Sequence, residues 1–226
     1  MPYLPNYFLF RLYAQEGDEG KWITLADGRH ILIGGKPSLT DTSGNKFEVD
    51  VLSQKKGGNL HYTLRRGDTT VGRLILTDEV EDKSGNKAVG LVYLEGGQAT
   101  QSNLKGAGTL LVAKAIDESF RRGYDGRVTL ASMPAAEGFY VGLGFTKSSM
   151  SYLSTGQPYN FTIGGDDARK VLQMAKVRYG GIPVDSTFKE EAWKMDYVKV
   201  TDEDIRKFNG AIEMEDGIKQ FVKPTK

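Results

Sequence analysis

The chain has 226 residues, contains no cysteine, and nearly balances 30 lysines and arginines against 29 aspartates and glutamates. The absence of cysteine excludes disulfides, thiolate metal sites and cysteine nucleophiles, and the balanced charge argues against a dedicated nucleic-acid-binding protein. No apolar run approaches the ~20 residues that span a bilayer, and the first residues lack the pattern of a signal peptide, so we expect a cytoplasmic protein with no membrane contact.

The first half of the chain predicts mostly β structure. The segment "KWITLADGRHILIGG" indicates a β-hairpin that turns at Asp27 and Gly28. Alternating or β-branched runs follow, with glycine-rich turns between them, at residues 46–53, 59–66, 69–77 and 87–95. The tetrapeptide SGNK precedes two of these runs, which indicates repeated turn chemistry rather than a repeated domain.

After residue 102 the hydrophobic period changes from 2 to 3.6. Apolar residues recur on one helix face from Ala107 onward, and Gly123 supplies a C-terminal stop. A short strand is predicted at 127–132, so the strand at 87–95 should lie parallel and close to it across a helical crossover. A second helix is expected at 135–145 and a last strand at 151–155.

Beyond residue 156 the pattern is helical. One helix is expected to begin at Asp166 or Asp167, and another opens with a capping box from Thr201 to Asp204. We expect this extension to offer a contact for a partner or for a second copy of the chain.

Two glycines stand at the start of the first helix, where they weaken local structure. Gly106 and Gly108 follow a predicted strand, at the edge of the sheet where ligands of α/β proteins bind. Unpaired N–H groups of a first helical turn hold phosphate well, and Lys105 could add a charge. A Rossmann fingerprint is excluded because Leu111 stands where its third glycine belongs. A simple tight turn into the helix is the alternative.

One combination of segments indicates a family. The sequence "NLKGAG", then a helix, a short strand and "AAEGFYVGLGF", resembles the GNAT superfamily of acyl-CoA-dependent acyltransferases over about residues 46–155. The resemblance implies a three-layer α+β core around a central mixed sheet. With it we expect three parts: an N-terminal extension at 1–44, the core at 45–155, and a helical extension at 156–226.

The resemblance also implies a function, N-acyl transfer from acetyl-CoA to an amine without a metal, and we expect the acceptor amine to belong to a macromolecule, a protein. The strand that ends in Glu95 would bind the pantetheine arm, and the glycine loop would bind the diphosphate. The implied carrier-binding residues are Val92, Tyr93, Leu94, Asn103, Leu104, Lys105, Gly106, Ala107, Gly108, Thr109 and Ala136. Tyr140 would protonate the leaving thiolate, since a phenol with a pKa of ~10 keeps its proton at neutral pH. Glu95, at the strand end, is the candidate base.

Three features depart from the family pattern. Asn103 replaces the usual Gln or Arg, and Met133 stands where many relatives have an asparagine. Only "QKKGG" separates the first two core strands, where the family has two helices that shape the acceptor groove.

The alternative function is a catalytically inactive GNAT-fold binding or structural protein. On that interpretation Tyr140 is a core residue and Glu95 a solvated carboxylate. The enzyme hypothesis would be overturned by a side chain that fills the N-terminus of the first helix, or by two neighbouring strands that pair with no cleft between them. A metal site is not expected from His30 and His61, which come from different strands. The segment "KWITLADGRHILIGG" also resembles parts of bacteriophage head proteins, which would place the chain in the host cytoplasm or in a virion.

Overall fold

The structure, a computed structural model, describes residues 21–24, 30–33, 36–77, 79–82, 84–97, 103–147, 159–180, 198–215 and 220–221. Within these residues, no helix combines the length and the apolarity that crossing a bilayer requires. The strand expected at 151–155 lies outside the described residues.

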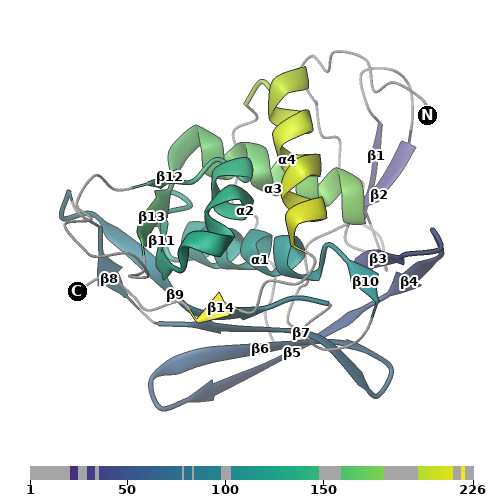
Figure 1. Ribbon diagram of the computed structural model, residues 1–226, viewed down its shortest axis with the longest axis horizontal. Coiled ribbons are helices and arrows are strands. Elements are labelled where there is room, and N and C mark those ends of the chain that lie inside the picture. The colour runs from purple at the N-terminus through teal and green to yellow at the C-terminus, as the bar shows by residue number, and fades with distance from the viewer. Residues whose placement is uncertain are drawn as a thin grey trace.

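A mixed nine-stranded sheet forms the centre of the molecule (Figure 1). Its main path runs in the order β12-β13-β11-β9-β7-β6-β5, and β8 and β14 also pair with β9. The bounds are β5 (Asp50–Lys56), β6 (Asn59–Arg66), β7 (Thr69–Leu76), β8 (Val80–Glu81), β9 (Lys87–Glu95), β11 (Val128–Ser132), β12 (Thr146–Lys147), β13 (Tyr159–Ile163) and β14 (Gln220–Phe221). From β5 through β6 and β7 to β9 each strand is antiparallel to the next, whereas β9 and β11 are parallel.

Helix α1 (Ala107–Arg121) makes the crossover between the two parallel strands. The expected parallel pairing is thus confirmed, as the strand–helix–strand pattern requires. Strand β9 pairs with β11 only from Val89 to Leu91. Beyond that point, toward Glu95, β11 is no longer the hydrogen-bonded partner of β9.

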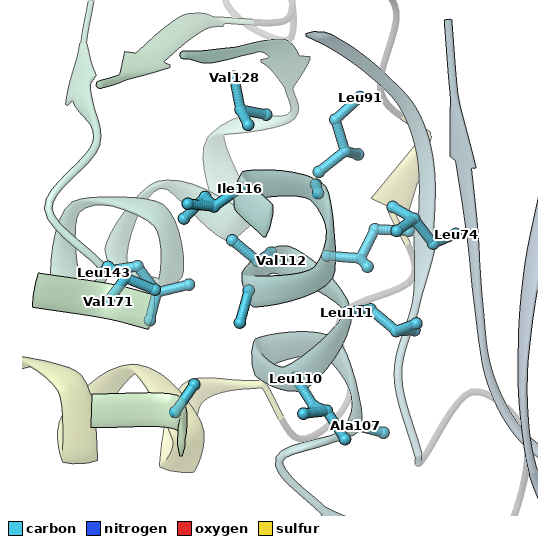
Figure 2. Packing of buried hydrophobic residues seen from close by; sticks show 14 of the residues in the cluster. Leu74, Leu91, Ala107, Leu110, Leu111, Val112, Ile116, Val128, Leu143 and Val171 are labelled. Carbon is cyan, nitrogen blue, oxygen red and sulfur yellow. The ribbon is translucent and has the colours of Figure 1, made fainter. Parts of the chain in front are cut away.

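The core forms around α1, whose apolar residues are almost completely shielded from solvent. Figure 2 shows Leu111 on the side of α1 that faces Leu74 and the sheet, with Val171 and Leu143 on the opposite side. The same core cluster joins strand, crossover helix and C-terminal helices. Burial of an aliphatic side chain stabilises by about 1.5–3 kcal/mol, so the helices beyond residue 156 are an integral part of this fold.

Three further helices lie with α1 on one side of the sheet (Figure 1). They are α2 (Glu137–Gly142), preceded by the 3₁₀ turn η1 (Pro134–Ala136), α3 (Gly165–Tyr179) and α4 (Asp202–Met214). Helix α4 approaches α2 closely where α2 carries glycine: a Cβ on Gly142 would stand 2.9 Å from the Cβ of Ala211. The capping box predicted for Thr201 and Asp204 is present.

Two small sheets complete the described structure. Strands β1 (Lys21–Thr24) and β2 (His30–Ile33) form the predicted hairpin, although its turn lies outside the described residues. Strands β3 (Ser38–Asp41), β4 (Lys46–Glu48) and β10 (Leu104–Lys105) form the other sheet.

The expected fold class, an α+β protein with a central mixed sheet, is confirmed. Two elements differ in detail. The run at 46–53 is divided between β4 and β5, which belong to different sheets. The helix expected at 135–145 begins as a 3₁₀ turn and ends at Gly142. Strand β13 lies in the central sheet beyond residue 155, and the domain boundaries at 45 and 155 stay predictions.

Candidate functional site

The N-terminus of α1 carries no cap from its own sequence. Its N-cap is Gly106, which has a left-handed backbone (φ 85°) and no side chain to accept a hydrogen bond. The first turn of α1 holds no acidic residue. A helix start of this kind leaves N–H donors and the positive end of the helix dipole without a local partner.

Glu215, directly after α4, supplies that partner. One of its carboxylate oxygens accepts a hydrogen bond from the Gly108 N–H (2.5 Å). The other accepts from the N–H and the hydroxyl of Thr109, both at 2.9 Å. The Glu215 residue is 8% exposed. The expectation of bare amides at this helix start is therefore not met: a carboxylate from 107 residues further along the chain fills it. A filled helix start is the arrangement that counts against the enzyme hypothesis and favours the binding or structural alternative.

The glycines around α1 leave room for side chains of the C-terminal extension. A Cβ on Gly108 would lie 3.0 Å from the carboxyl carbon of Glu215, and one on Gly96 would lie 2.8 Å from a carboxylate oxygen. A Cβ on Gly106 would lie 2.4 Å from the hydroxyl oxygen of Tyr179, the last residue of α3. A Cβ at Gly96 or Gly106 would come closer than real Cβ atoms do, so the neighbouring side chain would have to shift, and a Cβ at Gly108 would make an unusually tight contact.

The far half of β9 is also occupied. Strand β14 pairs antiparallel with β9, with Gln220 opposite Leu94 and Phe221 opposite Tyr93. Because β7 pairs with the same two residues of β9 from its other edge, β14 must lie on the edge that faces β11. This is the edge where β11 has stopped pairing. Figure 1 shows β14 beside β9, below α1 and α2.

Tyr140, the predicted acid, lies inside the core. It is 0% exposed, and its ring makes edge contacts with Phe139 and Phe145. Among the described residues its hydroxyl finds no hydrogen-bond partner. Burial alone raises the pKa of Tyr140 well above its ordinary value. In this conformation the hydroxyl can therefore give a proton only to a group that enters the core beside it.

Glu95, the predicted base, ends β9 and is 8% exposed. Its carboxylate accepts a hydrogen bond from the Arg73 guanidinium on β7 at 2.8 Å. Partial burial, with the negative charge of Glu95 as the next cause, raises the pKa of Tyr93 above its usual value. The two predicted catalytic residues thus have different environments: Tyr140 lies among apolar side chains, and Glu95 forms an ion pair.

The remaining predicted carrier-binding residues lie around the same helix start or on the neighbouring strand. Leu104 and Lys105 form β10. In the antiparallel pairing of β10 with β3, Leu104 lies opposite Asp41 and Lys105 lies opposite Thr40. Asn103 has a left-handed backbone (φ 54°). Ala107, Thr109 and Ala136 are buried, and Val92 is half-buried in β9. The roles proposed for all of these residues, and for Tyr140 and Glu95, stay predictions.

No site for a metal ion is apparent in the part of the chain that the structure describes: no three histidine, aspartate or glutamate side chains gather there. His61 lies on β6 and His30 on β2, in different sheets.

Two of the comparisons with known proteins find nothing: no family model and no curated protein matches the chain. Among solved structures, the chain is similar to a Bacillus subtilis acetyltransferase in complex with CoA, with 13% identity and a TM-score of 0.41. The match covers 52% of this chain and 99% of that one. A likeness of this size says nothing about the chemistry of this chain, and it does not bear on a bacteriophage origin. The fold class rests on the strand order and on the βαβ crossover described above.

Sequence reasoning missed the occupants of the site. Glu215, Tyr179 and β14 come from the C-terminal extension, which carried no site prediction. The available signal was indirect: a helix start with two glycines and no acidic or hydroxyl cap needs an acceptor from elsewhere.

Proposed function

We propose that the chain is an acyl-CoA-dependent N-acyltransferase of the GNAT type whose carrier site is held closed by its own C-terminal segment. The observation that carries the proposal is the pair of contacts made by that segment. Glu215 places an anion on the first turn of α1, and β14 places extended backbone on the free edge of β9. A CoA thioester would need the same two elements, an anion site for its diphosphate and a strand edge for its pantetheine arm.

In the proposed reaction, a neutral amine attacks the thioester carbon, a C–N bond forms and the C–S bond breaks. Tyr140 gives its proton to the departing sulfur, and Glu95 takes the surplus proton from the nitrogen. Backbone N–H groups of β9 would stabilise the oxyanion. Water then returns the proton from Glu95 to Tyr140.

The buried hydroxyl of Tyr140 supports this role. An unsatisfied buried polar group costs about 1–3 kcal/mol, and phenylalanine would fill the same space without that cost. Since Tyr140 has no partner among the described residues, a thiolate arriving beside it would supply one.

The second candidate is a GNAT-fold binding or structural protein without acyl transfer. The observation that favours this second candidate is that side chains of the same protein fill the space beside the motif glycines. Gly106 and Gly108 accommodate Tyr179 and Glu215, and a tight turn joins β5 to β6 where the family has two groove-forming helices. On this interpretation the C-terminal extension fills the carrier site permanently.

A transfer assay separates the two candidates. The protein and its Glu215→Ala variant are incubated with labelled acetyl-CoA and a mixture of lysine peptide and spermidine. The proposed function predicts label on the amine, with a rate that falls at least tenfold in the Tyr140→Phe variant. If neither protein transfers label at CoA concentrations that saturate other acyltransferases, the proposed acyl transfer is contradicted. The second candidate, a binding or structural protein, then remains.

A further inference from the structure

Glu215 and strand β14, which are described on either side of residues 216–219, contact two separate elements. Glu215 and Gln220 are five positions apart in the sequence, yet one reaches the start of α1 and the other pairs with the end of β9. Neither contact is local, because both α1 and β9 lie more than 100 residues earlier in the chain.

Glu215 binds as a small anionic ligand would. Two N–H groups and one hydroxyl, from Gly108 and Thr109, donate to its two oxygens. Hydrogen bonds to an ionised acceptor are about twice as strong as neutral ones, and the helix dipole adds to them. The N-terminus of α1 therefore binds an anion, and that anion is a side chain of the same protein.

Tyr179 gives an independent indication that this site takes a larger group than a carboxylate. Its hydroxyl oxygen lies over the N-cap Gly106, and the residue is only 3% exposed. The hydroxyl makes no hydrogen bond of ordinary geometry among the described residues, although the side chains of Thr109 and Arg178 interact with it. Burial, together with the nearby charge of Glu215, raises the pKa of Tyr179, so the hydroxyl keeps its proton. A buried hydroxyl that lacks a well-formed hydrogen bond beside an anion site would gain one when a group with more oxygens enters.

Strand β14 closes the second half of the same site. Its backbone occupies the edge of β9 at Tyr93 and Leu94, where β11 has already left the pairing. Strand β14 and an extended ligand cannot both hydrogen-bond to β9 at this edge. The presence of one therefore excludes the other.

We infer that the segment from Glu215 to Phe221 is an internal competitor of the carrier, in which the Glu215 carboxylate takes the place of a phosphate group and β14 the place of an extended arm. This inference rests on the proposed function for the identity of the carrier. The protein then exists in a closed and an open state, and its apparent affinity for a carrier falls in proportion to the open fraction. An open fraction of about 1% would weaken binding about 100-fold.

Calorimetric titration of the full-length protein with CoA, and separately with inorganic pyrophosphate, tests this inference. Three proteins are compared: the natural sequence, Glu215→Ala and the matched control Glu213→Ala, which removes an exposed carboxylate two positions earlier on α4. We expect Glu215→Ala to bind both probes at least tenfold more tightly than the natural sequence, and Glu213→Ala to bind like the natural sequence. Glu215→Gln, which keeps the shape but loses the charge, is expected to lie between them and serves if the alanine variant does not fold.

The outcomes separate the inference from the proposed function. CoA binding that is equally tight in the natural sequence and in a folded Glu215→Ala protein overturns the inference and leaves the proposed function standing. Pyrophosphate binding gained in Glu215→Ala without any CoA binding supports the displaced-anion inference and contradicts the proposed function. Binding of neither probe by the folded variant overturns both.

Discussion

At the scale of a single residue, replacing Tyr140 tests whether its hydroxyl stabilises the fold or is kept for a chemical role. Because the hydroxyl is buried without a described partner, Tyr140→Phe should raise the free energy of unfolding by about 1 kcal/mol. Tyr62 is the matched control, since its hydroxyl is also buried but donates to Glu118 at 3.3 Å. Tyr62→Phe should lower the free energy of unfolding by about 1 kcal/mol. Urea denaturation of both variants measures the two effects, and a destabilised Tyr140→Phe protein would mean that the hydroxyl has a partner.

The glycine at the start of α1 yields a second residue-scale prediction. In Gly108→Ala the new methyl group would stand 3.0 Å from the Glu215 carboxyl carbon, so the carboxylate has to move away. We expect a loss of about 1–2 kcal/mol of stability, as a buried hydrogen-bonded group is displaced. Gly210→Ala on α4 is the control: nothing lies within 4 Å of its added Cβ, and alanine in a helix interior stabilises by about 1 kcal/mol. Equal effects of the two changes in thermal denaturation would contradict the assigned contact.

How far the site could be predicted is also decided at this scale. The glycines of "NLKGAG" mark a helix start at which the Glu215 carboxylate accepts hydrogen bonds, and the diphosphate expected there stays a prediction. A glycine, however, shows only that space is needed at its position, and it does not identify the group that fills that space. The occupant is a glutamate 107 positions away, and no local pattern in the sequence links the two positions. The same limit applies to Tyr179, whose approach to Gly106 depends on how α3 packs on α1.

Among the elements, α4 has to be well formed because it presents Glu215. Its capping box pairs the Thr201 hydroxyl with the Asp204 N–H, and the Asp204 carboxylate with the Thr201 N–H. Loss of such a cap costs about 1 kcal/mol. Thr201→Ala should therefore lower the free energy of unfolding by about that amount, measured by urea denaturation. An unchanged stability would show that α4 does not depend on its cap.

The same cap predicts a dependence on pH. Partial burial of Asp204 would raise its pKa, but the hydrogen bonds from Thr201 and the charge of Lys170 hold that pKa below the usual value. A carboxyl with a lowered pKa in the folded state stabilises fully above its unfolded pKa of about 3.9, and this contribution is lost as pH falls below that value. We expect the difference in stability between the natural sequence and Asp204→Asn to be constant from pH 6 to 7 and to shrink below pH 4. A difference that persists unchanged at pH 2.5 would contradict this prediction.

The elements were more predictable than the site. Strands β6, β7 and β9 and helix α1 follow the expected ranges closely, because the hydrophobic period of each is set by its own residues. Strand β14 has two residues and no period of its own. It forms because β9 has a free edge beyond Leu91, and that edge exists only in the folded sheet.

The whole molecule combines a mixed-sheet α+β core with a C-terminal extension that returns to the same sheet. Helices α3 and α4 pack in the core cluster with α1, and the chain after α4 reaches both β9 and α1. In the proposed account the extension has two tasks, since it completes the core and closes the carrier site.

Amide hydrogen exchange with and without saturating CoA, followed residue by residue on the natural protein, tests this account most directly. We expect CoA to abolish the protection of the one β14 amide, of Gln220 or of Phe221, that donates to β9, because β14 then leaves β9. The amides of Gly108 and Thr109 should stay protected, because they exchange a carboxylate acceptor for a phosphate one. Protection of β14 that persists while CoA is bound, or a protein that binds no CoA even when Glu215 is replaced, would contradict it.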